Sequence, residues 1–190
     1  MTKTRLEAFS DGVVAILITI MVLELKVPHG ASWDVLEPLL PVFLTYVLSF
    51  INIGIYWNNH HHLLHTSKHV TGGILWANLH LLFWLSLIPF TTGWMGENHN
   101  APLPTAIYGV NLVLAAIAYT ILTITIIRAH GPGSELQRAI GSDFKGKVSI
   151  ALYVTAVPCA FVHVYISDAI YVAVAMMWLV PDRRIERVHH

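Results

Sequence analysis

Charged and polar side chains lie near both ends of a membrane-length apolar stretch at the start of the chain. Residues 5–25 read RLEAFSDGVVAILITIMVLEL, with Arg5, Ser10 and Asp11 near one end and Glu24 near the other. Ionisable side chains are costly inside a bilayer and normally face protein or water, so Asp11 is a candidate functional residue that attracts protons or cations. It also has a structural interpretation, in which it pairs with Arg5 or another basic group, or bonds backbone amides. Glu24 is expected to lie in water at the outer face.

One face of this stretch carries Ile16, Thr19, Ile20 and Leu23, which are spaced i, i+3, i+4 and i+7. If symmetry-related copies of the helix surrounded an axis, Ile16, Ile20 and Leu23 would form stacked apolar constrictions, and Thr19 would offer a hydroxyl. Hydrophobic rings of this kind gate or filter ions by resisting hydration. The same spacing suits ordinary helix packing or a lipid-facing surface, and it does not separate these interpretations.

A second candidate site is the histidine-rich segment NNHHHLLHTSKH. Its i, i+3 and i+4 histidine pairs have the spacing that two imidazoles need to reach one metal from a helix: His60, His61, His62, His65 and His69. A histidine-based metal-binding membrane protein is therefore an alternative function. A single cluster without a run of carboxylates argues against a catalytic metal and favours a polar helix end at the membrane interface.

The composition is that of an integral membrane protein. Of the 190 residues, 55% are hydrophobic and only 12% are charged, against about 25% in ordinary soluble domains. This excludes a soluble enzyme. Basic and acidic residues cancel, so the net charge indicates no nucleic-acid partner, and the lone Cys159 excludes an internal disulfide and a cysteine-built metal centre.

The hydropathy pattern predicts one domain, residues 1–190, with six membrane spans. A bilayer core about 30 Å thick needs roughly 20 helical residues for each crossing. The predicted spans cover residues 5–25, 39–60, 70–92, 103–127, 148–163 and 167–181. The polar side chains of Asn52 and Asn58 in the second span are candidates to bond Ser10 or Asp11 across the helix interface.

Charge bias decides between five and six spans. The apolar block from Val148 to Val180 is too long for one crossing but short for two, and we place a hairpin near His163 to Asp168. Six spans collect ten of the eleven cations on one side and leave only Lys26 opposite. The cations that share a side are Lys3, Arg5, Lys68, Arg128, Arg138, Lys145, Lys147, Arg183, Arg184 and Arg187. The positive-inside rule then predicts a multi-pass protein of the cell membrane with both termini cytoplasmic.

The first helix also carries a recognisable motif. Arg5, Phe9, Ser10 and Asp11 form the pattern R-x-x-x-F-S-D, followed by GVVAILITIMVLEL. This resembles the first helix of the TMEM175 family of lysosomal and prokaryotic potassium channels. The short six-span chain and the NNHHHLLH segment resemble the prokaryotic branch of that family.

The resemblance implies an all-α integral membrane protein that is not an enzyme: a homotetramer with six transmembrane helices per subunit, no re-entrant pore loop, and a pore lined by the first helix. It implies a potassium channel, weakly selective over sodium, whose hydrophobic layers fall on Ile16, Ile20 and Leu23 with Thr19 beside them. Arg5, Phe9, Ser10 and Asp11 would hold the base of the pore helix. Its partners would be further copies of itself, the lipid bilayer and monovalent cations, with no cofactor apart from permeant potassium ions.

The sequence itself agrees with one part of this implication and leaves one alternative open. It contains no TVGYG-like run, so it does not encode a carbonyl-lined filter of the usual potassium-channel kind. A secondary transporter is the second alternative function, because discontinuous helices and an intramembrane acid are typical of transporters. The lack of a convincing internal repeat argues against it.

Overall fold

The described part of the chain folds into α-helices, with three short 3₁₀ helices in the connection between the first two. The computed structural model describes residues 2–67, 69–131, 137 and 143–179. Its α-helices are α1 (Lys3–Met21), α2 (Leu40–His65), α3 (Gly72–Ser86), α4 (Ile88–Glu97), α5 (Pro102–His130), α7 (Phe144–Cys159) and α8 (Val164–Leu179). Three short 3₁₀ helices, η1 (Val22–Glu24), η2 (Trp33–Val35) and η3 (Glu37–Leu39), lie between α1 and α2. The predicted all-helical fold is confirmed.

Four segments are long and apolar enough to cross a bilayer, judged by length and composition. They are Lys3–Glu24, Trp33–His65, Gly72–Glu97 and Pro102–His130, and the two remaining helices, α7 and α8, have 16 residues each. The third segment consists of α3 and α4, which are interrupted at Leu87. Pro89 explains the interruption, because it cannot donate the backbone hydrogen bond that a continuous helix would need there. The described residues therefore form four segments that fit a crossing by length and composition, together with the shorter helices α7 and α8.

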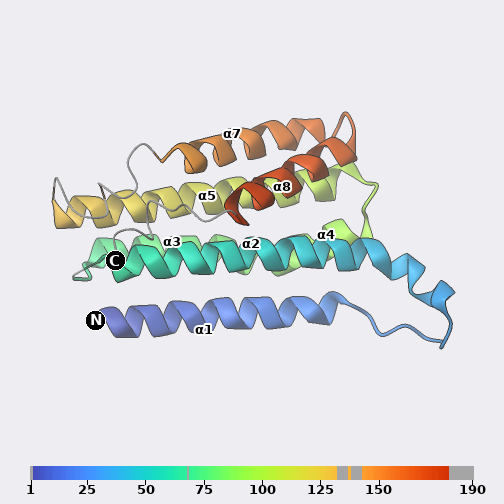
Figure 1. Cartoon of the computed structure of the whole chain (residues 1–190), viewed down its shortest axis with the longest axis horizontal. Helices are drawn as coiled ribbons and strands as arrows, with labels where there is room; N and C mark the ends of the chain where they lie inside the picture. Colours follow the sequence, from blue (N-terminus) through green and yellow to red (C-terminus); the bar gives the residue numbers. More distant parts are fainter. Residues whose placement is uncertain (1, 68, 132–136, 138–142, 180–190) are drawn as a thin grey trace.

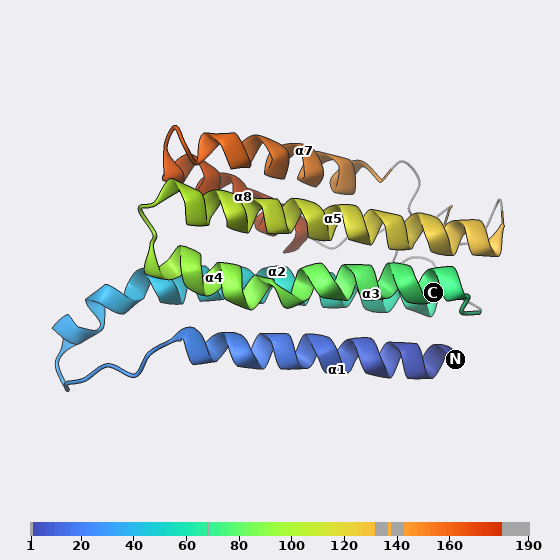
Figure 2. The same cartoon turned by 180° about the vertical axis from the view of Figure 1, so that it is seen from behind.

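The helices run side by side, with α1 at one edge of the bundle (Figures 1 and 2). It contacts α2, α3 and α4, whereas α5 contacts α3, α4, α7 and α8. One hydrophobic core joins α1, α2, α3 and α5 around the fully buried Ile53, Leu81 and Leu122. A second core joins α5, α7 and α8 around Tyr108 and Tyr171. The first helix is thus packed on one side only.

Most described cations lie at one end of the bundle, as the charge bias predicts. Lys3 and Arg5 stand at the start of α1, Arg128 near the end of α5, and Lys145 and Lys147 at the start of α7. The start of α1 and the end of α5 lie at the end of the bundle that holds the N-terminus, and α7 begins in the same half of the bundle (Figure 1). Lys26 follows η1 at the opposite end. The other cations counted in the prediction, Lys68, Arg138, Arg183, Arg184 and Arg187, lie outside the described residues.

Two helices extend beyond the predicted spans, because polar or small residues there pack inside the bundle. The second helix continues past residue 60 to His65, since His60, Leu63 and Leu64 are buried and extend its packed face. The third span continues past residue 92 to Glu97. Its Gly93 and Gly96 are buried and allow close helix contact, and a Cβ at Gly96 would lie 2.9 Å from the Cα of Val42. Glycine here indicates close packing instead of a loop.

The predicted hairpin near residues 163–168 also lies in a different place. The last two helices meet at residues 160–163, so α7 begins and ends, and α8 begins, a few residues earlier than the predicted spans. Pro158 lies in the last turn of α7, where its lack of an N–H helps to end the helix. The Ser167 hydroxyl, 2.6 Å from the carbonyl oxygen of Ala156, then fastens α8 back onto α7.

Candidate functional site

The first helix has one buried face and one uncovered face. Its buried residues are Leu6, Ser10, Val14, Leu17 and Met21, which repeat every three or four positions. The uncovered face carries large apolar side chains: Phe9 is 49% exposed, Ile16 59%, Ile20 40% and Leu23 76%. The predicted pathway residues therefore lie on the side of α1 and η1 that the rest of the described chain leaves open.

Leu23 does not share the α-helix of the other three residues. The sequence predicts a helix to residue 25, but α1 ends at Met21, and Leu23 lies in the tighter 3₁₀ turn η1. Pro28 restricts Val27 to extended backbone, so the chain must leave the helix before this point. The expectation of one continuous α-helical face from Ile16 to Leu23 is thus wrong at its C-terminal end, where Leu23 lies in η1.

Thr19 presents an oxygen acceptor on the uncovered face. Its hydroxyl lies 3.0 Å from the carbonyl oxygen of Ala15 and 2.9 Å from that of Ile16, and it donates its single proton to this part of its own helix. The lone pairs of the hydroxyl oxygen stay available on the exposed side. A cation could be coordinated by such an oxygen, whereas an anion would find no donor there.

Asp11 is held by the second helix. The indole Nε1 of Trp57 donates a hydrogen bond to the Asp11 carboxylate over 3.0 Å. The expected pairing with Arg5 is absent from the ion pairs of the described residues. Six residues of α-helix rotate the chain by about 600°, so Arg5 and Asp11 point to different sides of α1. Asp11 therefore fixes the α1–α2 contact through an aromatic N–H.

Ser10 belongs to a buried polar chain that joins three helices. Its hydroxyl donates to the carbonyl oxygen of Leu6 over 2.9 Å and accepts from the amide of Asn78 on α3 over 3.0 Å. The Asn78 oxygen lies 2.6 Å from Nε2 of His60 on α2. Because Ser10 has spent its proton on Leu6, Asn78 must turn its NH₂ group to Ser10, and His60 must carry its proton on Nε2.

The four motif residues therefore divide into two pairs. Ser10 and Asp11 point to α3 and α2, whereas Arg5 and Phe9 are exposed on the same side as Ile16. All four were expected to hold the base of the pore helix; within the described residues, Ser10 and Asp11 join α1 to the neighbouring helices through Asn78 and Trp57. Arg5 and Phe9 continue the uncovered face toward the N-terminal end of α1.

Sequence reasoning missed Asn78 and assigned the wrong partner to Asn52. Asn52 donates to the carbonyl oxygen of Leu48 and to the Tyr108 hydroxyl, and Asn58 is exposed, so neither bonds Ser10 or Asp11. The available signal for Asn78 was a carboxamide in the middle of an apolar span, which must find a partner. The fold supplies that partner, since α3 packs against α1.

The histidine cluster does not converge on one point. His60 is turned into the bundle toward Asn78, whereas His61 and His65 lie on the exposed side of α2 with their rings stacked 6.2 Å apart. Within residues 2–67, 69–131, 137 and 143–179, no three histidine, cysteine, aspartate or glutamate side chains gather as they would around a metal ion. The histidine-based metal alternative gains no site from these residues.

An ion pair ties the turn after α1 to the end of α4. The Lys26 ammonium donates to the Glu97 carboxylate, and this hydrogen bond together with the negative charge raises the pKa of Lys26. The Glu24 carboxylate packs on Gly93 of α4, where a Cβ would come within 2.6 Å of Glu24 Oε2. The C-terminal end of α1 is thus anchored on α4, and its N-terminal end on α2 and α3.

Known proteins resemble this chain in sequence and in fold. Residues 5–89 match the family described as endosomal/lysosomal potassium channel TMEM175. A Chryseobacterium sp. (strain P1-3) protein named a potassium channel is 60% identical over 187 residues, which make up 98% of this chain and 97% of that protein. The Gallus gallus protein named endosomal/lysosomal proton channel TMEM175 is 39% identical over 75 residues, 33% of this chain and 15% of its own length.

The fold is also that of a solved channel structure. The crystal structure of a lysosomal potassium-selective channel TMEM175 homolog from Chamaesiphon minutus matches with a TM-score of 0.80 and 27% identity, over 94% of this chain and 96% of that one. The matched family region contains α1, α2 and α3, the helices that carry Ser10, Asp11 and their partners. The chain therefore belongs to the TMEM175 family.

Proposed function

We propose that the chain is the pore-forming subunit of a potassium channel in the cell membrane. Four copies would surround one central pathway lined by α1, without a re-entrant pore loop, and both termini would be cytoplasmic. The relatives that are named potassium channels support potassium as the conducted ion. The cations gathered at the N-terminal end of the bundle support the orientation.

The observation that carries the proposal is the uncovered face of a well-anchored helix. Polar contacts to α2, α3 and α4 fix the orientation of α1, yet Ile16 and Ile20 are left without cover inside the subunit. Further copies arranged about an axis would cover this face with its own equivalents, as closed cyclic symmetry requires. Ile16 and Ile20 would then form narrow apolar layers that resist hydration and limit ion flow.

Selectivity in this arrangement would come from the α1 side chains. Backbone carbonyls of α1 are engaged in helix hydrogen bonds, so they cannot replace the hydration shell of an ion. Thr19 supplies the side-chain oxygen next to the Ile16 and Ile20 layers. One hydroxyl per subunit is a sparse ligand set, and the channel would therefore prefer potassium over sodium only weakly.

Ion flux through liposomes tests the pathway. We would measure potassium efflux from vesicles containing the purified protein, with sodium, caesium and proton flux as comparisons. Ile20→Ser should increase flux or reduce the preference for potassium, because a hydroxyl hydrates the constriction. Ile121→Ser on α5 is a matched control, since Ile121 is 41% exposed and Ile20 40%.

Two results would oppose the proposal. Equal fluxes from wild type, Ile20→Ser and Ile121→Ser, in preparations with the same oligomer size, would remove α1 from the pathway. Saturating flux without unitary current steps in planar bilayers would favour the transporter alternative. Native mass spectrometry of the same preparation tests the tetramer, and a mass other than four chains would reject that assembly.

A further inference from the structure

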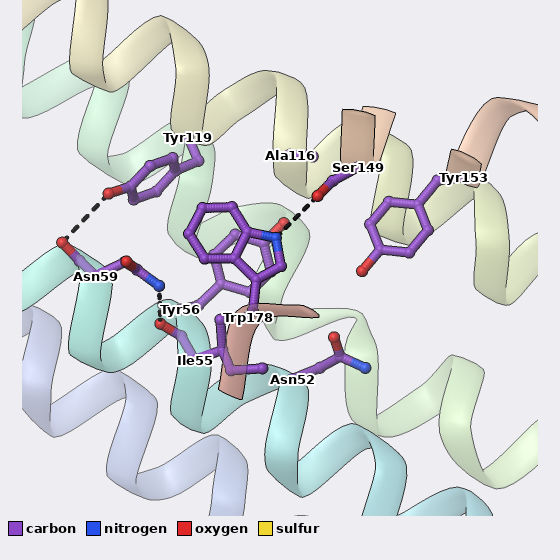
Figure 3. A pocket seen from close by; sticks show the side chains of 9 residues that line it. All are labelled: Asn52, Ile55, Tyr56, Asn59, Ala116, Tyr119, Ser149, Tyr153 and Trp178. Carbon is purple, nitrogen blue, oxygen red and sulfur yellow. Dashed lines mark hydrogen bonds between the residues drawn. The ribbon is translucent and has the colours of Figure 1, made fainter. Parts of the chain in front are cut away.

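A pocket lies between α2, α5, α7 and α8, on the opposite side of α2 from the pore helix. It encloses a cavity of about 50 Å³ and, with its mouth, about 440 Å³ of unfilled space. Four aromatic side chains line it, Tyr56, Tyr119, Tyr153 and Trp178, and Figure 3 shows them around the space beside the Trp178 indole. None of the described lining residues is acidic, basic or histidine.

Part of the polar lining is already satisfied by the protein. The Tyr119 hydroxyl donates to the carbonyl oxygen of Asn59 over 3.2 Å, and the Trp178 indole donates to the Ser149 hydroxyl over 2.8 Å (Figure 3). These bonds hold the aromatic walls in place. They connect α5 with α2 and α8 with α7, so the pocket is built from all four helices.

Another part of the polar lining has no partner among the described residues. Asn52 is 3% exposed, and its NH₂ group donates to the Leu48 carbonyl oxygen and the Tyr108 hydroxyl, but its Oδ1 accepts no hydrogen bond. Tyr153 is 4% exposed, and neither its hydroxyl nor that of Tyr56 is bonded within the described residues. In Figure 3 the Tyr153 hydroxyl points into the group of lining side chains. Among the described residues, only Thr123 Oγ1 and Asp168 Oδ1 are fully buried side-chain atoms without a hydrogen bond, so the unbonded atoms of Asn52, Tyr153 and Tyr56 keep access to the pocket space.

We propose that this pocket binds a small uncharged molecule with a ring-sized apolar body and one hydroxyl group. The aromatic walls suit a flat apolar body, because offset and edge-to-face ring contacts add to the burial of area. The Asn52 oxygen accepts the hydroxyl proton of the ligand, and a tyrosine hydroxyl donates to the ligand oxygen. A charged ligand is disfavoured, since no lining residue would compensate its lost hydration.

Water is the competing occupant. At about 10–15 Å³ for each molecule, the cavity has room for roughly three to five waters, which could satisfy the same atoms. The two occupants differ in how far the aromatic walls of the pocket stabilise them. A ligand of the proposed class gains from the ring contacts, whereas water does not.

Binding of simple phenols tests the proposal without using ion flux. We would titrate the full-length protein in lipid nanodiscs with 4-fluorophenol, and with fluorobenzene as the probe that lacks the hydroxyl, and follow ¹⁹F NMR. Wild type should bind 4-fluorophenol saturably and fluorobenzene more weakly. Ala116→Leu should abolish this binding by filling the pocket, whereas Ala151→Leu, at an exposed position on α7, should leave it unchanged.

A second variant keeps the test valid if Ala116→Leu fails to fold. Tyr153→Phe retains the ring and removes one hydroxyl. It should weaken the binding of 4-fluorophenol by about fivefold and leave the binding of fluorobenzene unchanged. Linear, non-saturable partitioning that is equal in wild type and both pocket variants would overturn the proposal and leave water as the occupant. Because the readout is binding, this failure is distinct from failure of the channel assignment.

Discussion

Trp57 Nε1 lies 3.0 Å from Asp11 Oδ1, and this hydrogen bond joins the pore-helix candidate α1 to α2 near the N-terminal end of the bundle. An acid in an apolar helix is expensive unless it has a specific partner. Here the partner is an indole, which keeps the carboxylate oriented without neutralising its charge. Asp11 can therefore both fix the helix and contribute a negative charge to that end of α1.

The Asp11–Trp57 contact should appear as a coupling energy. We expect Trp57→Phe and Asp11→Asn each to reduce the free energy of unfolding, and the double variant to lose less than the sum. Hydrogen bonds measured in membrane proteins couple by about 0.6 kcal/mol on average and reach about 1.7 kcal/mol. Unfolding in mixed micelles would measure the cycle, and full additivity would show that the contact contributes nothing.

The buried hydrogen bonds that join Ser10, Asn78 and His60 should make the fold sensitive to substitution of Asn78, the middle residue. Asn78→Ala leaves the Ser10 hydroxyl oxygen and the His60 N–H without partners, and each buried unsatisfied group costs about 1–3 kcal/mol. We expect a clear loss of folded protein in the same unfolding assay. Asn98→Ala is the control, because the Asn98 amide donates only to the Trp94 carbonyl oxygen at an exposed helix end. Equal losses in both variants would contradict the assigned role of Asn78.

The general architecture was readable from the sequence, and the reasons are local. A membrane crossing needs a long apolar run, so α1, α2 and α5 stand out by hydropathy, and the cation bias then predicts six crossings. Helix ends were harder to predict. Gly93, Gly96 and His60 look like turn or interface residues in a one-dimensional reading, and only packing against neighbours reveals them as buried.

The candidate site was predictable to the same extent. The face with Ile16, Thr19 and Ile20 follows from helix periodicity, because neighbours on one face recur every three or four residues. The partners of Ser10 and Asp11 cannot be inferred from helix periodicity, since Asn78 and Trp57 lie 68 and 46 positions away in the chain. Periodicity describes one helix and carries no information about which side chains of other helices meet it.

The close approach of α4 to α2 at Gly96 should tolerate no side chain. Gly96→Ala would push its Cβ to 2.9 Å from the Val42 Cα, a backbone atom that cannot turn away. We expect a destabilisation of about 1–3 kcal/mol, as overpacked positions show. Gly54→Ala on α2 meets no atom within 4 Å and should be neutral or stabilising by about 1 kcal/mol. Unchanged stability of Gly96→Ala would show that the two helices are farther apart.

The Lys26–Glu97 ion pair predicts a change at high pH. The bond and charge of Glu97 raise the pKa of Lys26, so its stabilising contribution is fully present below the pKa of an unfolded lysine and is lost as pH rises through the folded value. We expect Glu97→Gln to move the Lys26 titration to lower pH, measured by ¹⁵N NMR of the ammonium group. An identical titration in wild type and variant would mean that the pair does not form in solution.

Thr19 should influence which cations pass. Its hydroxyl proton is held by the α1 backbone, so its oxygen faces the uncovered side of the helix as an acceptor. Thr19→Val keeps the branched shape and removes that oxygen, and we expect lower potassium flux and a reduced preference for potassium over sodium. Thr155→Val is the matched control on α7, where an exposed threonine makes the same kind of bond, to the Ala151 carbonyl oxygen. If both variants conduct like wild type, the oxygen next to Ile16 and Ile20 has no part in selectivity. Any discrimination among cations would then have to arise from the width of the apolar layers alone.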